Sequence, residues 1–238
     1  MAHQKRKLSD LISEDAKVAP RRSLAEEAAD TLRELILLES LKPGTALSER
    51  DIADALGISR TPLKEAVRVL EAEGLIEYGP TRRPRVANPS LEELRQNLQV
   101  LGVLEGLAGE LACSVATDGE IAAVRRLCDR MNAAPEDIDP LEYFRWDMEF
   151  HRRIVEASRN APLISTHAQY NARLWRARFI SSKRRNERNS TLGQHIDIID
   201  ALTRRDGAET SAQMRRHLET TVVNISKTFR HAEMRVET

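Results

Sequence analysis

Cysteine and aromatic residues are scarce in this chain of 238 residues. Its two cysteines, Cys113 and Cys128, form no C-x-x-C pair, which excludes a disulfide-stapled scaffold and a thiolate zinc site. Aromatic residues make up only 4% of the sequence, whereas Ala, Leu, Glu and Arg are abundant, and this composition favours helices. We therefore expect a mainly α-helical protein, long enough for one large domain or two modest ones.

Long apolar runs and an excess of charge of either sign are also lacking. No stretch of about 18 apolar residues occurs, and residues 1–20 are polar, so we expect no membrane span, no secretory signal and a cytoplasmic location. With 37 basic and 37 acidic residues the net charge is zero, which is unusual for a nucleic-acid binder. Six basic residues nevertheless fall between positions 59 and 85, and local placement matters more for phosphate contact than the sum.

The order of predicted elements in the first part of the chain indicates a winged helix-turn-helix. A flexible polar arm is expected at residues 1–22. The patterns that follow predict helices near 24–39, 48–56 and 59–73, then strands near 75–78 and 85–87. This is the order of a helix-turn-helix with a small β-hairpin as its wing, which we assign to residues 23–88. Ser48 and Ser59 are expected to cap the second and third helices.

The third helix carries the residues that would read DNA. In a helix-turn-helix the second helix of the motif enters the major groove, and its first residues reach base edges. Arg60 can bind guanine through two hydrogen bonds, and Ser59 and Thr61 suit phosphate oxygens. An arginine on the preceding helix is expected on the DNA backbone or a base edge, and two arginines at the hairpin tip are expected in the minor groove. The alternative is a helical hairpin with solvated charges. The candidate residues are Arg50, Ser59, Arg60, Thr61, Lys64, Arg82 and Arg83.

Only helical patterns occur in the rest of the chain, so we predict an all-α helical bundle at residues 89–232. Asp147 and His151 are four residues apart and share one helix face, and His195 and His217 lie on two later helices. A carboxylate and three imidazoles from facing helices suit a divalent metal ion such as zinc, nickel or manganese. The alternative is structural, because an Asp-x3-His pair is often a surface ion pair and His195 can serve a local network.

Four segments of the first domain occur together in a known order: LKPG at 41–44, LSE at 47–49, LGISRTPLKEA at 56–66 and LEAEGL at 70–75. They resemble the DNA-binding domain of GntR-family regulators, and the resemblance implies that Arg50, Arg60 and Lys64 contact DNA. Two departures stand out. The family usually has arginine where this chain has Lys64, which softens base discrimination. The wing also lacks the usual glycine near Arg83, so its tip is not expected to follow the usual backbone path.

Three segments of the second domain also form a pattern: YFRWDMEFHRRI at 143–154, QHIDIIDAL at 194–202 and MRRHL at 214–218. They resemble the FCD-type ligand-sensing domain of the FadR subfamily of GntR regulators. The resemblance implies a metal ion beside the effector, and its expected ligands are Asp147, His151, His195 and His217.

The effector itself is expected to be a small organic acid or a related metabolite. The family usually has an arginine where this chain has Leu101, which points to a less acidic effector or to one oriented by the metal. Arg173 or Arg176 is the candidate for holding an anion, and the rest of the basic cluster at 173–185 is expected to be a solvated face.

These inferences together predict a ligand-responsive DNA-binding regulator, expected to be a repressor and a homodimer, and not an enzyme. Its partners are double-stranded operator DNA and the effector, with no membrane. Effector binding in the bundle would change the spacing of two recognition helices that must lie about 34 Å apart. Two alternatives remain open. The metal can itself be the effector, or one aspartate and three histidines can activate water in a metal-dependent hydrolase.

Overall fold

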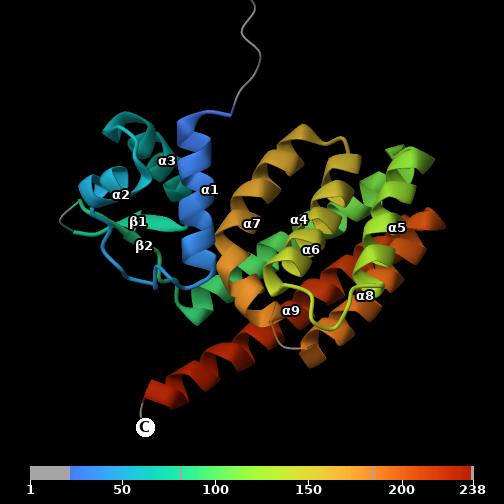
Figure 1. Cartoon of the computed structure of the whole chain (residues 1–238). Coiled ribbons are helices and arrows are strands. Elements are labelled where there is room, and N and C mark those ends of the chain that lie inside the picture. Colours follow the sequence, from blue (N-terminus) through green and yellow to red (C-terminus); the bar gives the residue numbers. More distant parts are fainter. Residues whose placement is uncertain (1–21, 81, 184, 237–238) are drawn as a thin grey trace, which may run out of the picture.

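The computed structural model describes the backbone of residues 22–80, 82–183 and 185–236, and their side chains except at 185–190, 228 and 230–236 (Figure 1). The arm predicted at residues 1–22 lies outside the described residues but for its last position. The described chain is mainly α-helical with one small antiparallel sheet, as the sequence predicts.

The N-terminal domain has the predicted order of three helices and a hairpin. Its elements are α1 (Leu24–Leu37), α2 (Glu49–Leu56), α3 (Arg60–Ala72), β1 (Ile76–Tyr78) and β2 (Pro84–Val86). Apolar side chains from all three helices and both strands meet in one core, in which Leu32, Leu63, Leu70 and Val86 are almost fully buried. The periodicity of apolar residues therefore places one face of each helix inward.

The helix caps of this domain agree with the sequence except at one serine. The Ser48 hydroxyl accepts a hydrogen bond from the Asp51 backbone, and Gly57 ends α2 with a positive φ of 65°. Ser59 stands at the N-cap of α3, but its side chain makes no capping hydrogen bond. The reason is Pro62, the third residue of the helix, which has no N–H to donate to that hydroxyl. The Ser59 side chain is exposed instead.

The wing is a short hairpin in which Ile76 pairs with Val86 and Tyr78 pairs with Pro84. At its tip, Arg82 has a φ of 55° and donates its backbone N–H to the Gly79 carbonyl oxygen. This is the left-handed conformation, which costs a non-glycine residue about 1–2 kcal/mol. The wing tip therefore holds an arginine in a conformation that glycine adopts without strain.

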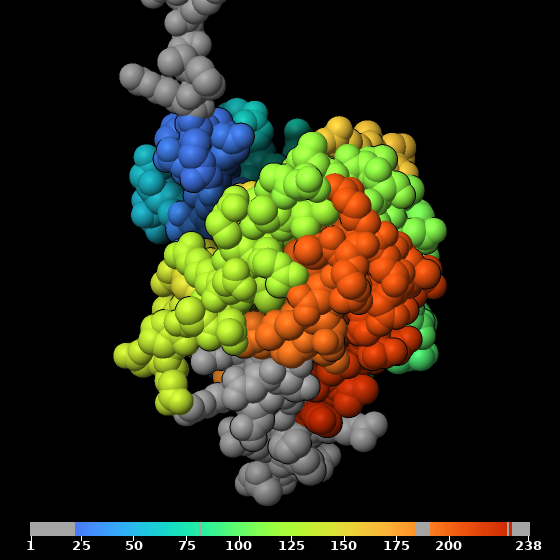
Figure 2. All heavy atoms as spheres, turned by 90° about the vertical axis from the view of Figure 1, so that its right-hand side faces the viewer, coloured from blue at the N-terminus to red at the C-terminus, as the bar shows by residue number. Residues whose placement is uncertain are grey.

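The C-terminal domain is a bundle of six helices, within the described residues. They are α4 (Leu91–Val115), α5 (Asp118–Asn132), α6 (Pro140–Ala157), α7 (Ala161–Ser182), α8 (Arg185–Thr203) and α9 (Gly207–Val236). The long helices α4 and α9 pack along each other, and α6, α7 and α8 pack around them. Figure 2, seen from the right-hand side of Figure 1, shows segments of α5 and α8 side by side on the face away from the N-terminal domain.

Among the described residues, helix α4 is long and apolar enough to cross a membrane by length and composition. This differs from the expectation that the chain contains no such segment. Half of its most apolar window is buried inside the protein, against α9, α7 and α6. Helix α4 is thus the central helix of the bundle, and its apolar character follows from contact with neighbours on several sides.

Glycines on α4 allow the close approach of α9, and this leads to a stability prediction. A Cβ atom at Gly109 would lie 2.8 Å from Cγ2 of Thr210, a fully buried side chain whose hydroxyl is hydrogen-bonded to the Asp206 carbonyl. We expect Gly109→Ala to lower the free energy of unfolding by about 1–3 kcal/mol through overpacking. The matched control is Gly193→Ala on α8, where nothing lies within 4 Å; it should raise stability by about 0.5–1 kcal/mol. Urea unfolding measures both, and equal effects would contradict the packing argument.

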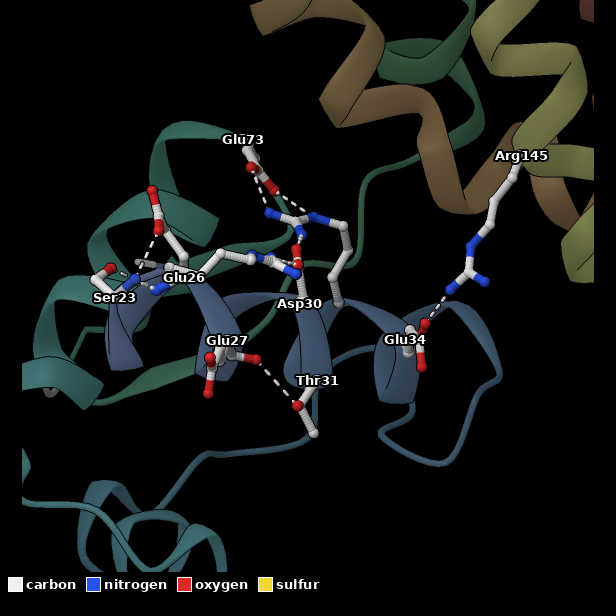
Figure 3. Close-up of polar contacts among 10 residues, drawn as sticks. Ser23, Glu26, Glu27, Asp30, Thr31, Glu34, Glu73 and Arg145 are labelled. Carbon is white, nitrogen blue, oxygen red and sulfur yellow. Dashed lines mark hydrogen bonds and ion pairs between the residues drawn. The ribbon is translucent and has the colours of Figure 1, made fainter. Parts of the chain in front are cut away.

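The two domains are joined by a shared apolar cluster and two ion pairs. Leu37 of α1 is 1% exposed and packs in one cluster with residues of α6 and α7, among them Phe144 and Phe179. Glu34 pairs with Arg145 of α6, as Figure 3 shows, and Arg176 of α7 donates to Glu39 at 2.7 Å. Helix α1 is therefore docked on the two helices α6 and α7.

Candidate metal centre and nucleic-acid interface

Helix α3 presents its basic residues outward. Arg60, Thr61 and Lys64 are exposed, whereas Leu63 and Ala66 on the opposite face are fully buried in the domain core. The side chains of Arg60, Thr61 and Lys64 are therefore not covered by other parts of the described protein. The N-terminus of α3, where the Ser59 hydroxyl makes no capping hydrogen bond, is thus open to a bulky ligand.

The other candidate DNA contacts are also on the surface. The Arg50 side chain is 76% exposed and lies 3.9 Å from Asp54, an exposed ion pair that holds it only weakly. Arg82 and Arg83 are exposed at the wing tip. Arg85, the middle residue of β2, is instead paired with Glu77 at 2.8 Å across the hairpin. The structure therefore leaves the wing-tip arginines accessible.

The four predicted metal ligands converge in the bundle interior. Asp147 and His151 come from α6, His195 from α8 and His217 from α9, and all three histidines are at most 2% exposed. Ligand atoms of the three histidines lie within 4.8 Å of one another. Asp147 Oδ1 lies 3.1 Å from His195 Nε2 and 3.8 Å from His151 Nε2.

The polar atoms at the centre of this cluster lack hydrogen bonds. Asp147 Oδ1, His151 Nε2 and both ring nitrogens of His195 are buried and have no hydrogen-bond partner among the described residues. Asp147 and His195 are close enough for a hydrogen bond, but their geometry is not aligned for one. Buried polar atoms are normally paired. Atoms that face a common point without pairing fit a metal ion, and their oxygen and imidazole donors suit a divalent one.

Neighbouring side chains orient two of the three rings. Glu105 Oε2 lies 2.7 Å from Nδ1 of His151, and Gln194 Oε1 lies 3.1 Å from Nδ1 of His217. Each oxygen can accept a hydrogen bond from the Nδ1–H group of its histidine, which leaves the Nε2 lone pair of that ring directed away from the oxygen. Partners of this kind fix the tautomer and orientation of metal-binding histidines.

Burial and nearby charges shift the pKa values of His195, His217 and Glu105 in the directions that favour metal binding. Burial lowers the pKa of His195, although Asp147 opposes the shift, and burial together with the two other histidines lowers the pKa of His217 well below its usual value. Burial alone would raise the pKa of Glu105, but His151, His167 and Arg178 lower it well below its usual range. Near neutral pH the two histidines are uncharged and Glu105 is a carboxylate.

Three buried residues beside the cluster were not predicted as site residues. They are Glu105, His167 and Arg178. His167 Nε2 lies 3.1 Å from Glu105 Oε1, and Arg178 lies 3.6 Å from the same oxygen. The available signal was Glu105 itself, an acidic residue within the most apolar helix pattern of the chain. For Arg178 the sequence offered no signal, because it lies in a run of arginines expected to be solvated.

The arginines predicted to hold an anion lie elsewhere. Arg176 pairs with Glu39 at the domain junction, and the exposed Arg173 packs against Gly74 and Tyr170. The buried arginine of this helix is Arg178, which is 4% exposed. It lines a small cavity of about 30 Å³ next to Asp147 and His217. The other residues around this cavity are Ser181, Ser182, Thr191, Thr221 and Asn224.

An outward-facing recognition helix with a wing, joined to a helical domain with a buried polar centre, defines a ligand-responsive DNA-binding transcriptional regulator. The family model "Bacterial regulatory proteins, gntR family" matches residues 24–86, and the FCD domain model matches residues 96–220. The chain belongs to the GntR family, and its FCD domain places it in the FadR-like subfamily.

Named relatives are similar over most of the chain. An uncharacterised HTH-type transcriptional regulator of Streptomyces ambofaciens is 30% identical over 84% of this chain and 84% of its own length. The Nta operon transcriptional regulator of Aminobacter aminovorans is 34% identical over 75% of this chain and 83% of its own length. The solved structure of E. coli McbR/YncC shares the fold with a TM-score of 0.75 at 20% identity, over 88% of this chain and all of that one.

Proposed function

We propose that this regulator is a homodimeric repressor whose operator affinity is set by a small organic acid bound beside a divalent metal ion. The observation that carries the proposal is the set of unpaired buried atoms of Asp147, His151 and His195. These atoms lie in the domain against which Leu37 of α1, the first helix of the DNA-binding domain, is docked.

In this proposal the exposed face of α3 enters the major groove. Arg60 binds a base edge, Lys64 binds a base or phosphate, and Ser59 and Thr61 bind phosphate oxygens. Exposure and the free Ser59 hydroxyl support these roles. Further contacts to the DNA backbone and the minor groove come from Arg50, Arg82 and Arg83. The left-handed conformation of Arg82 is expected to limit the contacts made by the wing tip.

The metal ion is held by Asp147, His151, His195 and His217, with zinc, nickel or manganese as the ion. When bound, it supplies a Lewis-acidic cation to which an effector oxygen can bind. The effector carboxylate is held by Arg178 instead of Arg173 or Arg176, because Arg178 alone of the three is buried beside the cluster. The cavity of about 30 Å³ holds little more than a water molecule, so an effector must push the helices apart to enter.

The homodimer is supported by an exposed apolar stripe on α4. Val100, Val103 and Leu107 follow one another at helical spacing, and between 39% and 54% of each is exposed. An apolar stripe of this kind on a soluble domain is typical of an interaction surface. Two copies joined here would present two recognition helices to successive major grooves.

A second candidate function is a metal sensor, in which the ion itself is the effector. The small cavity favours it, since the cluster has room for an ion and little room for a larger molecule. Operator binding measured with and without metal, in the absence of any organic acid, separates the two functions. A metal sensor responds fully to the ion alone.

The role of Arg178 gives a direct test of the organic-acid proposal. We expect at least one of lactate, malate and citrate to weaken operator binding of the metal-loaded protein. Arg178→Gln should reduce the affinity for that acid at least tenfold, because it removes the buried charge that faces the carboxylate. Arg178→Lys, which keeps the charge and loses the planar fork, should have an intermediate effect.

The matched control is Arg126→Gln, which removes an exposed arginine of α5. It should leave the acid affinity unchanged in isothermal titration calorimetry. Unchanged acid binding by folded Arg178→Gln protein would show that Arg178 is not the anion-binding residue.

A further inference from the structure

A second cavity, of about 290 Å³, lies between the two domains. Its N-terminal side is formed by Arg33, Glu73 and Leu75, and its other side by α6 and α7. None of the four proposed metal ligands lines it. We infer that this cavity is a separate binding site for a small, neutral aromatic molecule that carries a hydroxyl group.

The walls of the cavity favour a neutral, apolar body. Its apolar lining consists of Leu75, Val155, Ile164, Ala168, Ala172 and Trp175. The arginines at its edge are already paired: Arg33 donates to Glu73 at 2.7 Å, and Arg152 pairs with Glu149 and Glu156. No charge is left over to neutralise an ionic ligand, so a carboxylate would be poorly held here. An aromatic ring can instead pack against Trp175 and the paired guanidinium groups.

Two polar side chains on α7 supply the hydroxyl partners. His167 is 3% exposed, and its Nε2 lies 3.1 Å from Glu105 Oε1. In the neutral ring that donates from Nε2 to this carboxylate, Nδ1 keeps its lone pair. Asn171 lies one turn further, and its Oδ1 accepts a hydrogen bond from Arg178 at 2.8 Å. Neither His167 Nδ1 nor Asn171 Nδ2 has a hydrogen-bond partner among the described residues. One hydroxyl group can donate to Nδ1 and accept from Nδ2.

The same two residues connect the cavity to the metal centre. His167 binds Glu105, which orients His151, and Asn171 binds Arg178, which lies beside Glu105. The opposite wall belongs to the DNA-binding domain. A molecule in this cavity therefore contacts both domains and stabilises the docked arrangement by an amount that grows with the logarithm of its concentration relative to its Kd.

The test uses the full-length protein with phenol as the probe and benzoate as the charged comparison. We expect phenol to bind with one-to-one stoichiometry in calorimetry and to raise the midpoint of thermal unfolding. Benzoate should bind at least tenfold more weakly at this site. Ala172→Phe, which fills the cavity, should reduce phenol affinity at least tenfold and leave the metal content unchanged.

The matched control is Gln169→Phe, an equally large substitution on an exposed part of the same helix that does not line the cavity. It should bind phenol like the unmodified protein. Three results would each overturn the inference: no saturable phenol binding, equal binding of phenol and benzoate, or undiminished phenol binding by folded Ala172→Phe protein.

Discussion

Replacing Arg60 by alanine is expected to remove sequence-specific DNA binding while the protein remains folded. Arg60 is exposed at the first turn of α3 and forms no ion pair among the described residues, so its loss removes no internal contact. A bidentate arginine–guanine contact contributes about 1–3 kcal/mol per half-site. A dimer that loses both contacts is expected to bind its operator between about 30-fold and about 10⁴-fold more weakly.

The measurement needs an operator, which selection from a random pool of duplexes by the unmodified protein provides. Affinities for the selected duplex and for random DNA are then compared at one salt concentration, because phosphate contacts make both salt-dependent. Arg60→Ala should bring the two affinities close together, whereas the control Arg126→Ala on α5 should not. The stoichiometry of the operator complex, by sedimentation, tests the homodimer. Retained discrimination by Arg60→Ala would refute the assigned role of α3.

Replacing His195 and His217 together by alanine is expected to abolish metal binding. Two of the four proposed ligands are then lost, and Asp147 and His151 alone leave an incomplete site. We expect metal content, by elemental analysis of protein purified with one metal at a time, to fall from near one ion per chain to almost none. Gln194→Ala, which frees the Nδ1 of His217, should weaken metal binding by about 10–100-fold.

The control for this experiment is His167→Gln. His167 is also buried beside the cluster, but it faces Glu105 and not the other three histidines, and glutamine can still donate to Glu105. It should retain its metal. Because two large-to-small substitutions leave a cavity in the core, Asp147→Asn serves as a near-isosteric second variant and should also lose metal affinity. Full metal occupancy in both the double variant and Asp147→Asn would end the metal proposal.

Periodicity predicted the helices of this protein well, but it described side-chain environments less completely. The amphipathic pattern around Leu63 and Leu70 placed Arg60 and Lys64 on the outside of α3, and the structure shows them exposed. The lack of a cap at Ser59 was readable from the sequence, because the helix begins where predicted and Pro62, three residues later, has no N–H to donate to the Ser59 hydroxyl.

At the metal centre, too, local spacing predicted some features and the packing of helices decided the others. The four-residue spacing of Asp147 and His151 fixes them on one helix face, and the sequence alone supports grouping them. The orientation of His151 by Glu105, and the proximity of Arg178, depend on how α4 and α7 pack against α6. The run of arginines from 173 to 178 illustrates the limit. Neighbouring positions of one helix face different surroundings, so Arg176 reaches Glu39, just after the end of α1, while Arg178 is buried.

The sequence by itself determined the two-domain order, the helical class, the exposed basic face of α3 and the grouping of Asp147 with His151, because these follow from local periodicity and spacing. The tertiary structure decided which contacts form between elements that are distant in the chain. These are the docking of Leu37 on α6 and α7, the choice of Arg178 as the buried arginine, and the cavity between the domains. Such contacts depend on the packing of several helices at once, which no local pattern of residues encodes.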